Sequence, residues 1–340
     1  MAGSAAQFAA ASVPRVPQID PLFGPAKVAA ASPWESSPAS PPVPVRFQDR
    51  VWLHALLLGL TALTTTITGL EHYAAFLSEF GANRVSAGWS SIGYGAWYSA
   101  TILAILGAHE MGHYLACRYY RVDASLPYFI PMLGVLTGTF GAVIRIREPI
   151  VHKRALFDIG IAGPIAGFLV AVPALMTGMW LSTTVPLPRH FSGLSLGEPL
   201  LFKAAAWLVW GTAPDGLALN MHPMAFAAWF GLLATALNLF PIAQLDGGHI
   251  SYAVFGPRAT YITYASLAVA VTLTAVSLSW IVWTVMIVAM LLFAGPRHPR
   301  VMDEIVPLDR TRLWLAAFAL VMFVLCFTPA PIELLDLVQK

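Results

Sequence analysis

His109, Glu110 and His113 form the pattern H-E-x-x-H inside an otherwise apolar stretch of the sequence. Residues four apart lie on one face of a helix, so the two imidazoles can bind one metal ion. Zinc lowers the pKa of a bound water towards about 7, and Glu110, at the flank of that face, can then accept its proton. Charged residues in an apolar spanning segment cost about 2.5–3.5 kcal/mol and mark functional sites. The pattern therefore predicts a catalytic zinc site.

A third ligand is expected, because catalytic zinc usually takes three protein ligands and keeps one position open. The best candidate segment is residues 238–249, N-L-F-P-I-A-Q-L-D-G-G-H. Pro241 ends a helix there, and Gly247 and Gly248 let the backbone pass close to another helix. By spacing alone, Asp246 can be either the ligand or a turn-forming residue before the glycines.

The composition indicates which elements position these residues. The chain of 340 residues is 58% hydrophobic and 11% charged, with a mean hydropathy of +0.70. Soluble domains carry about 25% charged residues, and blocks of about 20 apolar residues can cross a bilayer as helices. We therefore expect an all-α polytopic membrane protein with six to seven transmembrane helices. The expected spans are residues 51–70, 94–117, 155–181, 223–241, two within 261–294 divided at 277–279, and 313–327.

Three segments do not fit the pattern of a spanning helix. Residues 1–48 are rich in Ala, Pro and Ser, which predicts a disordered tail; an organelle transit peptide is the alternative. Residues 124–147 are rich in β-branched residues and glycine, which predicts a short β-hairpin or re-entrant segment near the motif. Residues 200–210 are expected to lie at the membrane interface.

Basic residues determine the expected orientation, because Lys and Arg concentrate in cytoplasmic loops. They precede the first span and cluster between spans two and three, before span five, and between spans six and seven. With seven spans all these clusters fall on one side, so the N-terminus is expected in the cytoplasm and the C-terminus outside. The net charge of +2 does not indicate a nucleic-acid partner.

The two motifs together resemble the site-2 protease family of intramembrane zinc metalloproteases. These are H-E-x-x-H in one span and N-x-x-P-x-x-x-L-D-G-G at the end of a later one. The sequences G-T-F-G at residues 138–141 and A-G-P at residues 162–164 are also similar to that family. The resemblance covers roughly residues 95–255, and its Q-L-D-G-G version is most similar to the branch that includes plastid members. Ala243 stands where that branch commonly has Gly.

The resemblance implies one catalytic zinc ion with ligands His109, His113 and Asp246, and Glu110 as the general base. It also implies that Asn238 steadies the substrate backbone or the oxyanion, although an Asn can equally join two helices by a hydrogen bond. Residues 49–340 are then the protease domain, with a catalytic core at about 95–255. The implied activity is peptide hydrolysis within or next to the transmembrane segments of membrane-tethered proteins, such as anti-sigma factors or transcription factors.

Other residues are interpreted as structural. We expect His249 and His222 to be hydrogen-bonded, Asp158 to be a helix-start charge, and Gly160, Gly163 and Gly167 to allow close helix packing without a catalytic role. The two cysteines, Cys117 and Cys326, are far apart and predict no disulfide framework.

Two functions of other classes stay open: a metal transporter, because intramembrane His and acidic residues also mark ion pathways, and an inactive membrane scaffold. No second copy of either motif is present, which favours the enzyme over a transporter with internal repeats. The expected location is the bacterial inner membrane, with an organelle membrane as the alternative.

Overall fold

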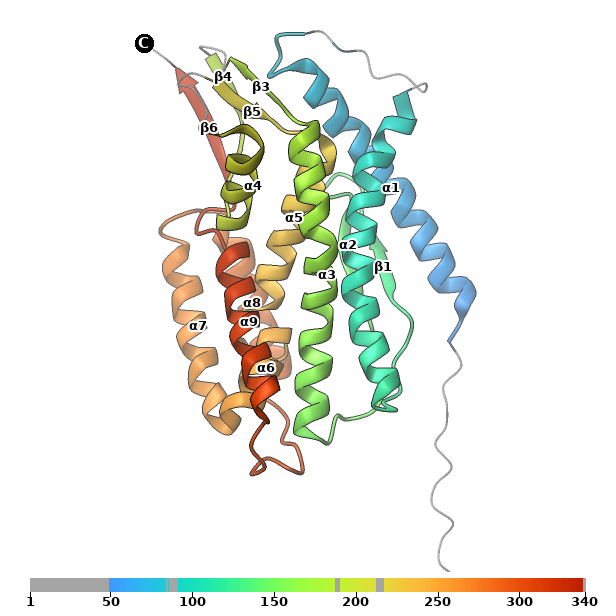
Figure 1. Ribbon diagram of the computed structural model, residues 1–340, viewed down its shortest axis with the longest axis vertical. Coiled ribbons are helices and arrows are strands. Elements are labelled where there is room, and N and C mark those ends of the chain that lie inside the picture. The colour runs from blue at the N-terminus through green and yellow to red at the C-terminus, as the bar shows by residue number, and fades with distance from the viewer. Residues whose placement is uncertain (1–48, 84, 86–90, 187–189, 212–216, 339–340) are drawn as a thin grey trace, which may run out of the picture. The chain divides into compact units, whose positions relative to one another are not determined.

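The computed structural model describes residues 49–338, apart from residues 84, 86–90, 187–189 and 212–216. The tail predicted for residues 1–48 lies outside these residues. The described part is mostly helical, as predicted (Figure 1). Its helices are α1 (Val51–Ser78), α2 (Ile92–Tyr119), α3 (Lys153–Leu181), α4 (Leu200–Trp210), α5 (Pro223–Asn238), α6 (Asp246–Phe255), η2 (Gly256–Arg258), α7 (Ala259–Leu273), α8 (Trp280–Ala294) and α9 (Arg310–Cys326).

Each predicted span is a helix, and most boundaries agree within a few residues. The first helix is longer than expected: it continues past residue 70 to Ser78 and ends where Glu79 and Phe80 adopt positive φ angles. α5 ends before Pro241, because the residue preceding a proline is disfavoured in a helix. Residues 277–279 separate α7 from α8, as predicted.

Among the described residues, α1 and α3 are the helices long and apolar enough to cross a membrane. α2 has 28 residues, but the polar residues of its motif lower its hydropathy. α5, α7, α8 and α9 have 16, 15, 15 and 17 residues, which is below the typical length of a spanning helix. The protein is thus a helical membrane protein with two candidate spans, and the count of six to seven stays a prediction.

Glycines set the distances between the central helices. A Cβ atom on Gly95 of α2 would lie 2.2 Å from the Thr66 oxygen of α1, and one on Gly112 would lie 2.5 Å from the Ala162 oxygen of α3. A Cβ on Gly178 of α3 would lie 2.3 Å from the Ala225 nitrogen of α5. Membrane helices use such small residues to bring their backbones close together. The sequence of contacts α1–α2–α3–α5 therefore depends on glycine at each step.

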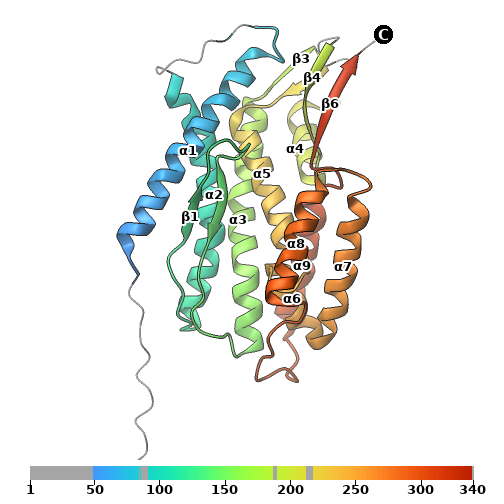
Figure 2. The ribbon, with the colours of Figure 1, turned by 180° about the vertical axis from the view of Figure 1, so that it is seen from behind.

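The strands form three antiparallel pairs. β1 (Tyr128–Pro131) and β2 (Thr139–Val143) make the hairpin predicted within residues 124–147, and β1 lies along α1 (Figure 2). β3 (Thr183–Pro186) pairs with β5 (Leu217–Asn220), and β4 (His190–Leu196) pairs with β6 (Ile332–Val338). These last two pairs were not predicted, because their partners are distant in sequence.

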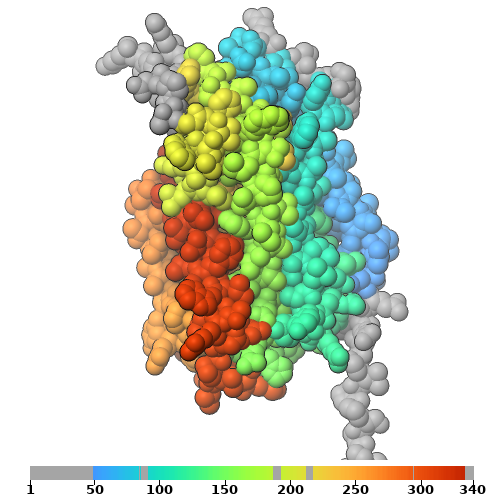
Figure 3. All heavy atoms as spheres, viewed as in Figure 1, coloured from blue at the N-terminus to red at the C-terminus, as the bar shows by residue number. Residues whose placement is uncertain are grey.

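The segments that carry the basic clusters meet at one end of the helical body, as the orientation argument predicts. They are the two ends of the α2–α3 connection and the α6–α7 and α8–α9 connections, which lie at the lower end in Figure 1. α9 rises from that end beside α3 and below α4 (Figure 3). The motif of α2 lies in the half of the helix nearer this end.

Candidate active site

The two histidines of the motif point at one spot. His109 and His113 lie one turn apart on α2, and their Nε2 atoms are 3.1 Å apart. Both side chains and that of Glu110 are buried. The α-helix alone produces this juxtaposition, because residues four apart share a face.

Asp246, the first residue of α6, completes the cluster. Its Oδ2 lies 3.3 Å from Nε2 of His109, and its Oδ1 lies 3.3 Å from Nε2 of His113. One ligand atom from each of the three residues lies within 4.8 Å of the others. A carboxylate is also favourable at a helix N-terminus, where backbone N–H groups are unpaired. The tertiary structure thus brings Asp246 close to His109 and His113, which the sequence spacing alone did not establish.

The donor atoms fit a zinc ion. Nδ1 of His113 lies 2.7 Å from the carbonyl oxygen of Ile159 on α3. A carbonyl oxygen only accepts hydrogen bonds, so Nδ1 carries the proton and Nε2 presents its lone pair to the cluster. Lone pairs that face a carboxylate at this distance repel each other unless a cation lies among them. Two imidazoles and a carboxylate are also a known ligand set of catalytic zinc.

Asn238, the last residue of α5, lies at the edge of this cluster. Its Nδ2 is 3.1 Å from Nε2 of His109. The amide therefore faces the space beside the proposed metal and is close enough to contact a substrate held there. This position is compatible with the role implied for Asn238, and it also joins α5 to α2.

Glu110 is connected to the hairpin. Its carboxylate forms a hydrogen bond with the backbone of Ile144, the residue after β2. The predicted general base is therefore in direct contact with the segment predicted to form the hairpin. Sequence reasoning did not identify this contact, because a backbone group carries no signal in the residue types.

Two glycines of α3 make room for the imidazoles, which corrects our expectation that they serve helix packing alone. A Cβ atom on Gly163 would lie 2.1 Å from Nε2 of His113, and one on Gly167 would lie 3.2 Å from Cβ of His109. Gly160 instead faces α6, where its Cβ would lie 2.9 Å from Cβ of His249. Gly163 and Gly167 thus line the ligand histidines, while Gly160 serves packing as predicted.

The turn before Asp246 explains why glycine is required at the two positions after it. Cβ atoms on Gly247 and Gly248 would lie 2.0 Å from the Leu239 oxygen and 2.2 Å from the Ala243 oxygen. Both glycines therefore let α6 fold back on the segment that follows α5. Ala243 has a φ of 39°, a left-handed conformation that glycine adopts without strain. This is the position where the similar proteases commonly have Gly.

The remaining candidates have structural contacts, as expected. His249 is hydrogen-bonded to His298, and His222 accepts a hydrogen bond from the Met224 nitrogen at the start of α5. Asp158 is the sixth residue of α3 and accepts a hydrogen bond of 2.8 Å from Arg312 of α9, so it joins two helices and is not the helix-start charge that we expected. Cys117 and Cys326 are free and buried.

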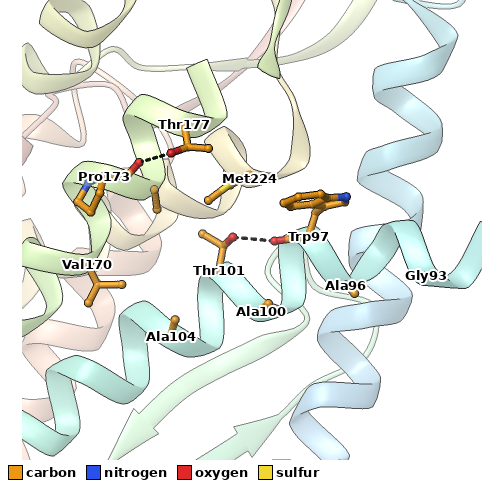
Figure 4. A pocket seen from close by; sticks show the side chains of 11 residues that line it. Gly93, Ala96, Trp97, Ala100, Thr101, Ala104, Val170, Pro173, Thr177 and Met224 are labelled. Atoms are coloured by element: carbon orange, nitrogen blue, oxygen red, sulfur yellow. Dashed lines mark hydrogen bonds between the residues drawn. The ribbon is translucent and has the colours of Figure 1, made fainter. Parts of the chain in front are cut away.

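A cavity of about 550 Å³ lies between α2, α3 and the start of α5, and not at the cluster (Figure 4). The hydroxyl groups of Thr101 and Thr177 point to carbonyls of their own helices, at Trp97 and Pro173. The other lining residues are apolar or small. This cavity presents no group that could catalyse a reaction.

Known proteins are similar to the part of this chain that contains both motifs. The model of Peptidase family M50 matches residues 97–282, which is 186 of the 340 residues. The chain is 35% identical over 166 residues to "Probable zinc metalloprotease EGY2, chloroplastic" of Oryza sativa subsp. indica, covering 48% of this chain and 30% of that protein. It is 30% identical over 243 residues to "Probable zinc metalloprotease EGY1, chloroplastic" of Arabidopsis thaliana, covering 69% and 43%. For "Probable zinc metalloprotease EGY3, chloroplastic" of Oryza sativa subsp. japonica, identity is 29% over 299 residues, covering 80% and 49%.

These matches span less than half of each relative's length. No solved structure matches the chain.

Proposed function

Because the chain belongs to peptidase family M50, we propose that it is a zinc metalloprotease that cuts other membrane proteins within or next to their membrane-spanning segments. The observation that carries the proposal is the meeting of His109, His113 and Asp246 beside Glu110. These residues have the types and spacing that a hydrolytic zinc site requires, and His113 has the tautomer that binds metal.

Several residues of the chain have distinct roles in the proposed reaction. When bound, zinc supplies Lewis acidity towards the scissile carbonyl and the attacking water. Glu110 accepts the proton of that water and transfers it to the leaving amine. Asn238 donates an amide hydrogen to the carbonyl oxygen as negative charge develops there. The Ile159 carbonyl keeps His113 in the tautomer that binds metal.

The metal test uses the full chain purified in detergent. We expect zinc in equimolar amount and cleavage of single-span model substrates. A phenanthroline chelator should abolish cleavage, added zinc should restore it, and a non-chelating isomer should have no effect. Absence of zinc would refute the site.

Measurements on the same purified protein distinguish the protease from the inactive scaffold and from the metal transporter. Bound zinc without cleavage of any substrate in the panel would favour the inactive scaffold. Zinc flux into liposomes containing the protein would favour the transporter. Family membership and the single copy of each motif support the protease over both.

We propose that β2 presents an extended substrate backbone to Glu110. β2 has β1 on one edge, and its Phe140 and Val143 side chains are exposed. Strand addition at a free edge uses backbone N–H groups, which proline lacks. Phe140→Pro and Val143→Pro should therefore reduce cleavage by at least about tenfold, the loss of roughly one strong hydrogen bond.

Phe140→Ala and Val143→Ala are the matched controls, because they remove the side chain and keep the N–H group. Ile144 is left unchanged because its backbone contacts Glu110. Zinc content reports whether each variant keeps its fold. Proline variants that retain zinc and full cleavage would contradict edge pairing.

Exposed apolar side chains support more membrane crossings than two. Val282 and Leu292 of α8 are 68% and 80% exposed, and Leu320 of α9 is 64% exposed. Apolar surface of this kind is stable when it faces lipid. We propose seven crossings, by α1, α2, α3, α5, α7, α8 and α9, with α4 at the interface.

We also propose a membrane location and a class of substrates. The chloroplastic relatives support an organelle membrane and do not support the bacterial inner membrane that the sequence favoured. Basic residues gather at one end of the helices, which supports our prediction that the N-terminus lies on the cytoplasmic side of the membrane.

The family match over residues 97–282 supports a catalytic core close to the predicted 95–255, within a protease domain of residues 49–340. Substrates would be membrane-tethered regulators, of which anti-sigma factors and transcription factors are examples.

A further inference from the structure

The α8–α9 loop, residues 295–309, lies against α6, the helix that begins with Asp246. Nδ1 of His298 is 2.7 Å from the Pro299 carbonyl oxygen, and its Nε2 is 2.7 Å from Nδ1 of His249. The carbonyl oxygen only accepts, so His298 carries its proton on Nδ1 and accepts at Nε2. His249 on α6 must then donate to His298. The direction of each hydrogen bond follows from the geometry.

A second contact joins the loop to the next turn of α6. The Tyr252 hydroxyl donates to Oε1 of Glu304 at 2.6 Å, and the Tyr252 ring stacks on His298 with centroids 4.3 Å apart. Burial and the Glu304 carboxylate raise the pKa of Tyr252 to about 12, so the hydroxyl keeps its proton. Asp246, His249 and Tyr252 follow one another at intervals of three residues and share one side of α6.

The other side of the loop is fastened to the start of α3. The buried ammonium group of Lys153 donates to the Glu304 and Val306 carbonyl oxygens at 2.6 and 2.9 Å. The Lys153 backbone nitrogen donates to Oδ1 of Asp303 at 2.6 Å. Glu304 thus bonds α6 through its side chain and α3 through its backbone.

α3 and α6 meet at the metal cluster itself. Ile159 of α3 holds His113, and the next residue, Gly160, packs against His249. α6 has ten residues and ends before Gly256, which has a positive φ; its Ile250 and Ala253 share a hydrophobic cluster with Phe157 of α3. A small rotation of α6 would move the Asp246 carboxylate relative to the two imidazoles. Metal sites require their ligands within about 0.5 Å of the productive position.

We propose that the α8–α9 loop positions Asp246 for metal binding by holding α6 against α3, with His298 and Glu304 as the positioning residues. This inference rests on the proposed metal site. The α8–α9 loop would then support the metal site from the surface of the protein without contributing a ligand.

The test compares His298→Ala and Tyr252→Phe with wild type, all as full chains loaded with zinc. The measured quantities are the rate of zinc release to a chromogenic chelator and the visible spectrum of the cobalt-substituted protein. We expect release about 10–100-fold faster, the usual effect of losing a group that orients a ligand, and shifted cobalt bands. His298→Gln keeps an acceptor and should restore part of the effect.

Met302→Ala and Ile305→Ala are matched controls on the same loop, since these side chains are 84% and 97% exposed. The double variant His249→Ala/His298→Ala should release zinc no faster than His298→Ala, because the two residues act through one bond.

Wild-type zinc release and cobalt spectra in both His298→Ala and Tyr252→Phe would overturn the positioning role. A loss of thermal stability that is equal in the metal-free and metal-loaded proteins, with unchanged release, would also overturn it. Absence of metal in the wild type would instead refute the site on which the inference depends. Neither readout requires a substrate, so the failure of the protease proposal is distinguished from failure of this one.

Discussion

Glu110→Gln is expected to abolish cleavage and leave zinc bound. Gln has the shape of Glu, and its amide oxygen can still accept the hydrogen bond from the Ile144 backbone. It cannot accept a proton from the attacking water, and loss of general base catalysis typically lowers the rate by about 10²–10⁴-fold. His109, His113 and Asp246 keep their positions. Metal analysis and cleavage of a single-span substrate on the same sample measure both effects.

Glu71→Gln is the control for removal of a carboxylate from a membrane helix, since Glu71 is exposed on α1. It should retain both zinc and activity. Undiminished cleavage by Glu110→Gln would refute the base assignment, while loss of zinc in that variant would show that Glu110 also supports the metal.

Gly163→Ala is expected to weaken zinc binding and thereby to reduce cleavage. The added methyl group would lie 2.1 Å from Nε2 of His113, and the Ile159 carbonyl holds the other side of that imidazole at 2.7 Å. The ring cannot move away without losing this hydrogen bond. Overpacking costs typically 1–3 kcal/mol, of which a better helix propensity returns about 1 kcal/mol. The effect should therefore appear mainly in metal affinity, as a weakening of at least about tenfold.

Gly178→Ala on the same helix separates this effect from a general disturbance of packing. Its methyl group would meet the Ala225 backbone of α5, at 2.3 Å from the nitrogen, and no metal ligand. We expect it to lower the melting temperature and to leave the rate of zinc release unchanged. If Gly163→Ala bound zinc as tightly as wild type, His113 could not lie where the structure places it.

The elements that depend on local sequence could be predicted. Apolar blocks predicted the helices, and the break at residues 277–279 separated α7 from α8. The extension of α1 to Ser78 was missed because Glu71 and His72 interrupt the apolar block, whereas the helix continues through them. The pairs β3–β5 and β4–β6 were missed because strand pairing across a long sequence separation leaves no periodic signal.

The sequence by itself predicts the chemistry of the proposed site and determines the part of its geometry that lies on one helix. H-E-x-x-H places His109, Glu110 and His113 together through helix periodicity, which needs no tertiary contact. Tertiary structure brought Asp246, which by spacing alone could have been only a turn-forming residue, to the two imidazoles, and it placed Gly163 beside His113. These relations join helices through backbone approach and hydrogen bonds to carbonyl groups. Such contacts depend on the distance between helices, which residue types and spacing do not specify.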